Sequence, residues 1–233
     1  ANGLSIQLLA RRAGWREKSL PVDLRLRPWY NPEMKTATFI IPGLVAIILT
    51  FSLIQFTASA IVRERERGTL EQLQVTPVTR IELILGKIVP FLLIGFFQFT
   101  TVLLLMRYLF GIPIRGSVPE LYLVGFLFIA AVLGLGMFIS TVAKTQMQAM
   151  QMSTFVLLPF VFLSGYVFPI DGMPKIFQLL THVIPAKYFI QVMRGLVLRG
   201  ATLRELWQPT LLLTVFTLTI IGLAVLRFKK TTD

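Results

Sequence analysis

The sequence predicts an all-α integral membrane protein, a polytopic helical bundle with about five transmembrane helices. Hydrophobic residues make up 55% of the 233 residues and charged residues only 15%, whereas an average globular chain has roughly 25% charged residues. The mean hydropathy is +0.74. The apolar residues also gather into runs of about 20, the length that crosses the roughly 30 Å hydrocarbon core of a bilayer. So few charged residues are not enough to form the water-exposed surface of a soluble protein.

Four apolar runs are predicted to be full spans, and a fifth is shorter and carries Pro159 in its middle. A proline there removes a helix hydrogen bond and can kink the helix, which packed neighbours tolerate. A sixth apolar stretch, 176–198, is interrupted by a proline and two basic residues, so we expect broken or re-entrant helices instead of a crossing. The five predicted spans are approximately 38–62, 88–110, 121–143, 150–168 and 206–226.

Residues 1–37 have a different composition. They hold seven Lys or Arg and three Asp or Glu, and residues 22–27 alternate apolar and charged side chains. That alternation is typical of a half-exposed strand. We therefore expect 1–37 to be the end of a water-exposed domain whose larger part is missing, and 38–233 to be the transmembrane domain.

The densest polar segment, residues 63–80, follows the first span without a break. Gly68 can end the first helix, Thr69 can cap a second one, and Pro77 would stop it. This predicts a short amphipathic helix on the membrane surface between two spans. It is either a solvated linker or a docking helix for a soluble partner, which could transmit a push to both spans. Its apolar edge consists of Leu70, Leu73 and Val75.

A second polar region, 168–185, precedes the last span. Asp171 and Gly172 form a turn signal, and Pro174 suits the first position of a helix. After Pro185 the sequence predicts another short helix, 188–198, which carries Arg194. The region is either an interfacial hairpin or a pair of half-helices that dip into the membrane and cap a pathway. Backbone breaks at membrane depth are tolerated only where protein or a cavity surrounds them.

A few polar side chains remain inside the spans, and they serve either helix packing or a mildly polar pathway. The candidates for pathway lining are Gln55, Thr57, Gln98 and Thr101. Small residues also recur four apart, at Ala130 and Gly134 and at Gly136 and Ser140. This spacing lets helices approach one another closely.

Several classes of function are disfavoured. The predicted spans carry no Asp or Glu in their cores, which counts against a secondary transporter driven by protons or sodium. No phosphate-binding loop motif occurs, and one histidine, His182, without any cysteine offers neither a catalytic triad nor a metal cluster. Glu64, Glu66 and Glu71 lie among arginines and are best interpreted as a charge-compensated helix face. The net charge of +12 comes mostly from basic residues beside apolar runs, which favours lipid headgroups over nucleic acid.

Taken together, these segments resemble ATP-binding-cassette export permeases of the type-2 class, in the bacterial multidrug-type branch. Residues 64–73 with Thr76 and Pro77 resemble the cytoplasmic loop of that family. Residues 162–169 and the motif at 29–32 before the first span are similar to it as well. The later matching positions are Met173, Pro174, Pro185, Tyr188, Arg194, Gly195 and Gly200.

The resemblance implies six spans per permease, with an extracytoplasmic domain between the first two, so this chain would lack the first span and most of that domain. It implies a coupling helix at about 68–80 that meets the ATPase, and re-entrant helices at about 170–200 that form an outer gate. The implied coupling residues are Glu64, Glu66, Gly68, Thr69, Leu70, Glu71, Leu73 and Pro77. The implied gate residues are Pro169, Asp171, Met173, Pro174, Pro185, Tyr188 and Arg194.

The function implied is that of a permease subunit in an exporter of amphipathic, drug-like or lipid-like molecules. ATP and Mg²⁺ would be used by separate cytoplasmic ATPase subunits, and this chain would bind no cofactor or metal and catalyse no reaction. A second permease, identical or different, would complete the transporter in a bacterial inner membrane. The alternatives are a membrane scaffold or regulatory subunit without a pathway, and a secondary transporter.

The resemblance also implies a topology, with residues 1–37 in the periplasm and the C-terminus in the cytoplasm. Charge alone does not decide it. With the N-terminus inside, 14 Lys and Arg lie on the cytoplasmic side and nine on the other, but without residues 1–37 the counts become seven and nine. Since the positive-inside rule is weak for domain-sized segments, the family orientation is the expected one.

Overall fold

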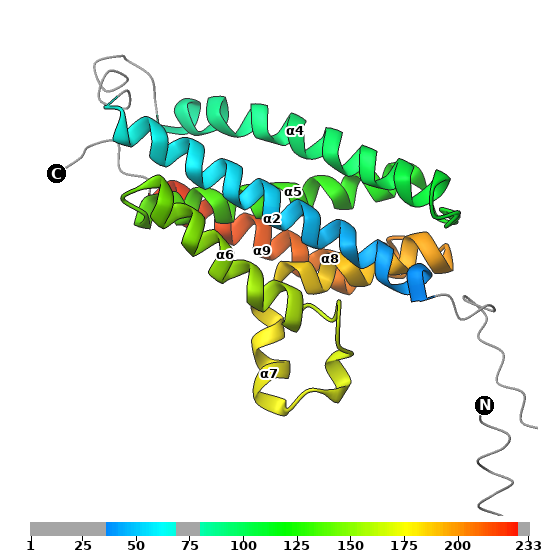
Figure 1. Ribbon diagram of the computed structural model, residues 1–233. Coiled ribbons are helices and arrows are strands. Elements are labelled where there is room, and N and C mark those ends of the chain that lie inside the picture. Colours follow the sequence, from blue (N-terminus) through cyan, green and yellow to red (C-terminus); the bar gives the residue numbers. More distant parts are fainter. Residues whose placement is uncertain (1–35, 69–79, 228–233) are drawn as a thin grey trace, which may run out of the picture. The chain divides into compact units, whose positions relative to one another are not determined.

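The computed structural model describes residues 36–68 and 80–227, and these residues are almost entirely helical (Figure 1). Five of the helices are long, namely α2 (Thr36–Glu66), α4 (Arg80–Tyr108), α5 (Val118–Val142), α6 (Gln146–Leu163) and α9 (Trp207–Arg227). The connections from α4 to α5 and from α5 to α6 are short, and between α6 and α9 the chain forms a series of short helices. The short ones are η1 (Ile170–Gly172), α7 (Lys175–Leu180), η2 (Thr181–Val183), α8 (Pro185–Arg194) and η3 (Gly195–Arg199).

Each of the five long helices contains a stretch that is long and apolar enough to cross a membrane, so the predicted fold class and the five spans are confirmed. The fourth span is displaced from its predicted position of 150–168. Helix α6 begins at Gln146 because the side chain of Thr145 caps it, accepting a hydrogen bond from the N–H of Gln148. It ends at Leu163, before the turn that contains Gly165.

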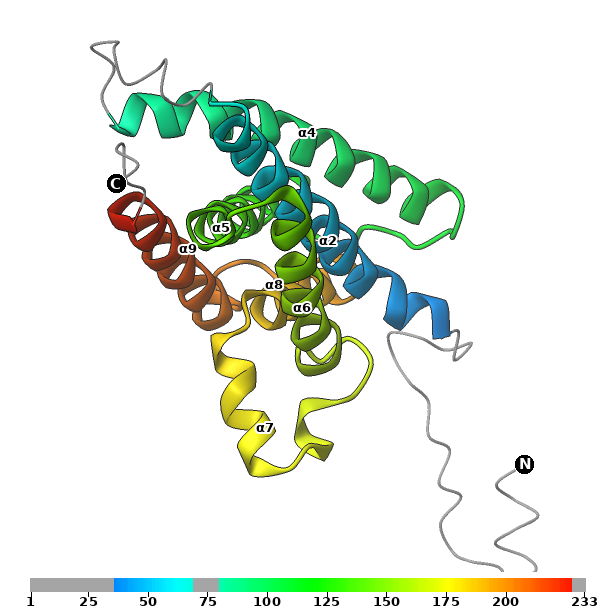
Figure 2. The ribbon, with the colours of Figure 1, turned by 60° about the vertical axis from the view of Figure 1, so that its left-hand side comes forward.

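Helix α5 is the centre of the bundle. It packs against α2 and α9 along much of its length and also contacts α4, α6 and α8, as Figure 2 shows with α5 viewed nearly end-on. Small residues permit this close packing. A Cβ atom at Gly136 would lie 2.9 Å from Cβ of Thr57 on α2, and one at Gly134 would lie 3.0 Å from Cγ2 of Ile220 on α9. The packing role predicted for small residues is therefore confirmed for Gly134 and Gly136.

Aromatic rings fill the core between α4, α5 and α8. The ring of Phe189 on α8 stacks on that of Phe128 on α5, with centroids 4.1 Å apart and planes 9° apart. Phe99 of α4 lies beside Phe189, and all three side chains are fully buried. Helix α8 is thus part of the core, although it is too short to cross a membrane.

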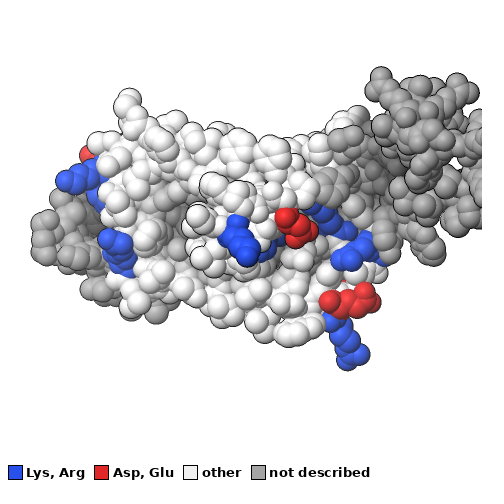
Figure 3. Space-filling view, turned by 90° about the horizontal axis from the view of Figure 1, so that it is seen from below, with Lys and Arg blue, Asp and Glu red and all other residues white. Residues whose placement is uncertain are grey.

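The surface is largely uncharged. In Figure 3 the charged side chains on the face shown gather near the two ends and at one place between them, and the rest of the described surface is white. Large apolar side chains such as Phe97, Phe155 and Leu226 are more than 70% exposed. A surface of this kind is suited to the hydrocarbon core of a bilayer, because moving apolar side chains from lipid into water costs free energy.

Candidate functional site

The predicted coupling segment begins where α2 ends. Helix α2 ends at Glu66, and Gly68 takes up a left-handed conformation with φ of 71° while its N–H donates to the carbonyl of Arg65 at 3.1 Å. The predicted helix end at Gly68 is therefore confirmed. Arg63 and Arg65 lie in the last turn, where positive charge complements the helix dipole.

The charged end of α2 is bonded to the start of α6 through Gln146. The carboxylate of Glu66 accepts hydrogen bonds from the backbone N–H of Gln146 at 3.0 Å and from its side-chain amide. Nε of Arg63 donates to Oε1 of the same glutamine at 3.0 Å. A carboxylate at the first residue of a helix also meets the positive end of that helix's dipole. Gln146 therefore joins two side chains of α2 to the first turn of α6.

The same end of α2 is also bonded to α4 and α5. Glu64 forms an ion pair with Lys87 of α4. Nη1 of Arg65 donates to the carbonyl of Ala143, the C-cap residue that follows α5, at 3.2 Å. Four consecutive side chains thus reach three other helices. They can do so because successive residues on an α-helix point about 100° apart, at 3.6 residues per turn.

We call this set of bonds the α2-end network; it consists of Arg63, Glu64, Arg65, Glu66, Lys87, Ala143 and Gln146. The prediction that these charges only compensate one another on one face of the helix was incomplete, because they also bond to neighbouring helices. Lys87, Ala143 and Gln146 were missed. Their only signal in the sequence was that each lies at a predicted span boundary, and therefore near the same end of the bundle as Glu66. The predicted coupling residues Thr69, Leu70, Glu71, Leu73 and Pro77 lie outside the described residues.

The predicted broken segment between the last two spans is confirmed as short helices joined by turns (Figure 1). Its details differ from prediction in two places. Pro174 precedes α7 as its N-cap and does not occupy the first helical position. The second helix begins at Pro185, three residues earlier than predicted, since a proline is accommodated in the first turn. It then continues as a π-helical turn until Gly200, which has a φ of 67°.

The two halves of this hairpin have opposite environments. Helix α8 buries Tyr188, Phe189, Val192 and Met193 in the bundle, and Gln191 is exposed. Helix α7 buries none of its residues, and Ile176 is 74% exposed. At the junction, the hydroxyl of Tyr188 donates to the carbonyl of His182 at 2.9 Å, and Nζ of Lys187 donates to Oγ1 of Thr181 at 3.0 Å. Burial lowers the pKa of Lys187.

Arg194 fixes the end of α8 to the turn after α6. Its Nη1 donates to the carbonyl of Gly165 at 3.2 Å. Tyr166, the next residue, packs against α2 so closely that a Cβ atom at Gly43 would lie 2.7 Å from its ring. Burial lowers the pKa of Arg194 to about 10, so the guanidinium is still charged at neutral pH. Arg194 therefore brings α8, the turn and α2 together.

The predicted gate residues do not form one cluster. Pro169, Asp171 and Pro174 are exposed around η1 and α7, and Met173 is half-buried there. Pro185 and Tyr188 are buried on α8, with Arg194 half-buried at its end. The hairpin thus consists of an exposed tip and a base that is packed into the bundle.

The four predicted pathway residues are not brought together within this chain. Gln98 of α4 accepts a hydrogen bond from Ser52 of α2 at 2.7 Å. Thr57 is buried in the close contact between α2 and α5, and Gln55 is half-buried nearby on α2. Thr101 is exposed on α4 and bonds to the carbonyl of Phe97 in its own helix at 2.8 Å.

Five spans, a network at one end of the bundle and a broken hairpin with a packed base define a polytopic helical membrane domain. The chain belongs to the ABC-2 family of transporter proteins, whose sequence profile matches residues 2–226. The resemblance identified from the sequence is therefore confirmed.

Bacterial permeases are among the relatives of this chain. It is 37% identical over 213 residues to the probable multidrug ABC transporter permease YbhS of Escherichia coli strain K12, a match that covers 91% of this chain and 56% of YbhS. It is 35% identical over 208 residues to the probable multidrug ABC transporter permease YbhR of the same strain, covering 89% of this chain and 56% of YbhR. It is 34% identical over 223 residues to that strain's inner membrane transport permease YhhJ, covering 94% and 59%. The chain thus spans little more than half the length of these curated relatives.

Proposed function

We propose that this chain is the membrane-spanning part of a permease subunit in an ATP-driven exporter. The observation that carries the proposal is the α2-end network, which connects the helix leading into the 69–79 segment with α4, α5 and α6. Membership in the ABC-2 family supports it. The chain itself is not an enzyme, and ATP and Mg²⁺ are used by separate soluble ATPase subunits.

The proposed mechanism begins when ATP binding closes two ATPase subunits against residues 68–80. Displacement of this segment moves the end of α2. Because Lys87 and Gln146 are bonded to that end, α4 and α6 move with it as one unit. The spans then tilt relative to a second permease, identical or different, and open a pathway at their interface. Glu64, Glu66, Gly68, Thr69 and Glu71 lie at or near the ATPase contact.

The substrate proposed is amphipathic, either drug-like or lipid-like, and it leaves the cytoplasm or the inner leaflet. An inner-membrane location fits the apolar helices and the bacterial permeases to which the chain is similar. In the proposed orientation, residues 1–37 belong to a periplasmic domain and the C-terminus is cytoplasmic. The α2-end network then faces the cytoplasm, and the hairpin lies at the outer mouth as a re-entrant gate.

The test uses the full-length protein, isolated from its native membrane in mild detergent and analysed for co-purifying proteins and ATP hydrolysis. We expect a stoichiometric soluble ATPase that is stimulated by an amphipathic substrate after reconstitution into liposomes. Replacing both Gly68 and Glu71 with alanine should leave the permease folded and separate ATP hydrolysis from export. The control is Gly222→Ala on α9, where an added Cβ would meet no atom within 4 Å.

Three outcomes contradict the proposal. If no ATPase co-purifies under any detergent condition, the chain is a scaffold or regulatory subunit of another assembly. If export continues normally in the Gly68 and Glu71 variant, the coupling site is elsewhere. If export collapses with the proton gradient while ATP is held constant, the protein is a secondary transporter.

A further inference from the structure

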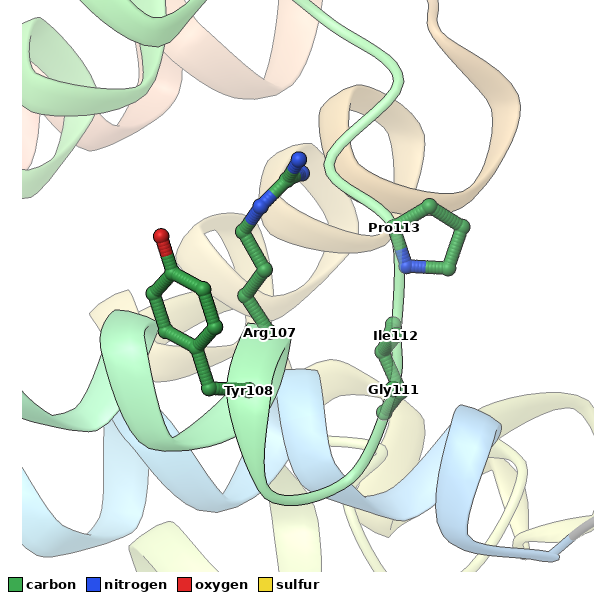
Figure 4. A pocket seen from close by; sticks show the side chains of 5 residues that line it. All are labelled: Arg107, Tyr108, Gly111, Ile112 and Pro113. Carbon is green, nitrogen blue, oxygen red and sulfur yellow. The ribbon is translucent and has the colours of Figure 1, made fainter.

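An open hollow of about 250 Å³ lies where α4 ends and the chain turns toward α5. The loop folds back onto the helix, since Ile112 is buried and its N–H donates to the carbonyl of Met106 at 3.2 Å. Figure 4 shows the side chains of Arg107 and Tyr108 extending in the same direction from the last turn of α4, with Pro113 on the loop that follows the helix. The lining residues are Arg107, Tyr108, Gly111, Ile112 and Pro113.

The positive charge of Arg107 is not compensated within the described part of the chain. Its side chain is exposed, and no hydrogen bond or ion pair joins it to residues 36–68 or 80–227. Helix α4 packs against α2, α5 and α9. The carboxylates of α2 lie at the opposite end of the bundle in the α2-end network, and Trp207–Arg227 contains no acidic residue. Glu120 of α5 accepts a hydrogen bond from the N–H of Leu203 at 3.1 Å. The hollow is therefore attractive to an anion.

An exposed, mostly apolar stripe leads along α4 to this hollow. Its members follow one another at intervals of three or four residues, so they lie on one side of the helix. Phe97, its second member, is 76% exposed, and Tyr108 is 78% exposed at its end. The stripe consists of Leu93, Phe97, Thr101, Leu104 and Tyr108. A molecule that covers both the stripe and the hollow has apolar chains and an anionic head.

We propose that a membrane phospholipid binds here, with its phosphate held by Arg107 and Tyr108 and its acyl chains lying along the stripe. A guanidinium can bind phosphate through two parallel N–H···O bonds, and the phenol hydroxyl can donate a further one. Tyrosine is also enriched at the boundary between membrane and water. Inorganic phosphate offers the same oxygens but has no chains to cover the stripe, so lipid is the expected source. This site requires only a bilayer and does not depend on the proposed transport function.

The experiment titrates the full-length protein in mild detergent with phosphatidylglycerol and counts bound lipids by native mass spectrometry. We expect Arg107→Gln to weaken phosphatidylglycerol binding about five- to tenfold, the effect of losing one charge and its hydrogen bonds. Arg107→Lys, which keeps the charge without the planar fork, should lie in between. Arg204→Gln removes an exposed arginine that does not line the hollow, and it should bind like the wild type. Diacylglycerol, which has the chains but no phosphate, should bind wild type and Arg107→Gln equally.

Several results would overturn the site. Equal loss of phosphatidylglycerol in Arg107→Gln and Arg204→Gln would mean diffuse attraction to a basic surface. Displacement of the lipid by millimolar inorganic phosphate would identify a free-anion site. A smaller dimer fraction in Arg107→Gln with unchanged lipid binding would mean that a second copy covers the hollow. If Arg107→Gln does not fold, Tyr108→Phe replaces it, with a smaller but measurable loss expected, and no loss would overturn the proposal.

Discussion

The two ends of the bundle are held together in different ways. Where α2 ends, side chains bond one helix to another, as Glu66 does to Gln146 and Glu64 to Lys87. Where α2 begins, tight packing predominates, and side chains such as Arg194 and Tyr188 bond to backbone carbonyls. Helix α8 is buried against α2, α5 and α9, and the N–H of Arg115 in the α4–α5 loop donates to the carbonyl of Val197 in η3 at 3.2 Å.

This difference suits two kinds of movement. Polar bonds between helix ends can make several helices follow one displaced helix without tight packing between them. Tight packing fixes α8 in one position, whereas α7, whose Leu179 is 72% exposed, has little buried surface to hold it. Segments with few buried contacts open or shift at low cost in free energy. In the proposed mechanism the first end would transmit motion, and at the second end α7 is the part with the least buried surface.

The largest effect is expected from Phe189→Ala at the packed end. It removes a fully buried ring that stacks on Phe128 at 4.1 Å, and such a truncation costs about 3–5 kcal/mol in the free energy of unfolding. Unfolding in mixed micelles with increasing SDS measures this loss. Phe177→Ala, the matched change on α7, removes a ring that is 46% exposed and should change stability by about 0.5 kcal/mol or less. Equal losses in the two variants would mean that α7 is as firmly packed as α8.

The arrangement of the spans could be predicted from the sequence because hydropathy and length are local properties. The helix end at Gly68 and the break at Pro185 were also predicted, since glycine and proline determine backbone conformation at their own positions. The start of α6 was placed four residues too late. Polar residues at 144–148 lower the local hydropathy there, although Thr145 already caps the helix.

The candidate site was predicted only in part. Glu64 and Glu66 stood out as a dense charged segment, but nothing local indicates that Glu66 bonds to Gln146, which lies 80 residues further along the chain. That pairing depends on how α2 and α6 pack. Which face of α8 is buried, and that Phe189 stacks on Phe128, likewise follow from tertiary packing and not from helical spacing alone.

A smaller effect is expected from Gln146→Ala at the polar end. The change removes the hydrogen bonds from its amide to Glu66 and from Arg63 to its oxygen, but it keeps the backbone bond to Glu66. We expect a small loss in unfolding free energy, well below that of Phe189→Ala, because both bonds are exposed and water competes for them. The same SDS titration measures it. Gln151→Ala, on an exposed position of the same helix with no hydrogen bond to the described residues, is the control and should be neutral. A neutral Gln146→Ala would show that the network does not join α2 to α6.

The smallest effect is expected from the ion pair between Glu64 and Lys87, and a double-mutant cycle isolates it. With Glu64→Gln and Lys87→Met made singly and together, we expect a coupling energy of about 0.5 kcal/mol that decreases at high salt, because the Glu64 side chain is 42% exposed although that of Lys87 is only 14% exposed. The control cycle pairs Glu64→Gln with Lys144→Met, another cation at this end that forms no bond with Glu64, and its coupling should be near zero. If the two cycles give the same coupling energy, Lys87 interacts only with the overall electrostatic potential of the charged end and not specifically with Glu64. A difference confined to Lys87 means that α4 is bonded specifically to α2, as a displacement shared between these two helices requires.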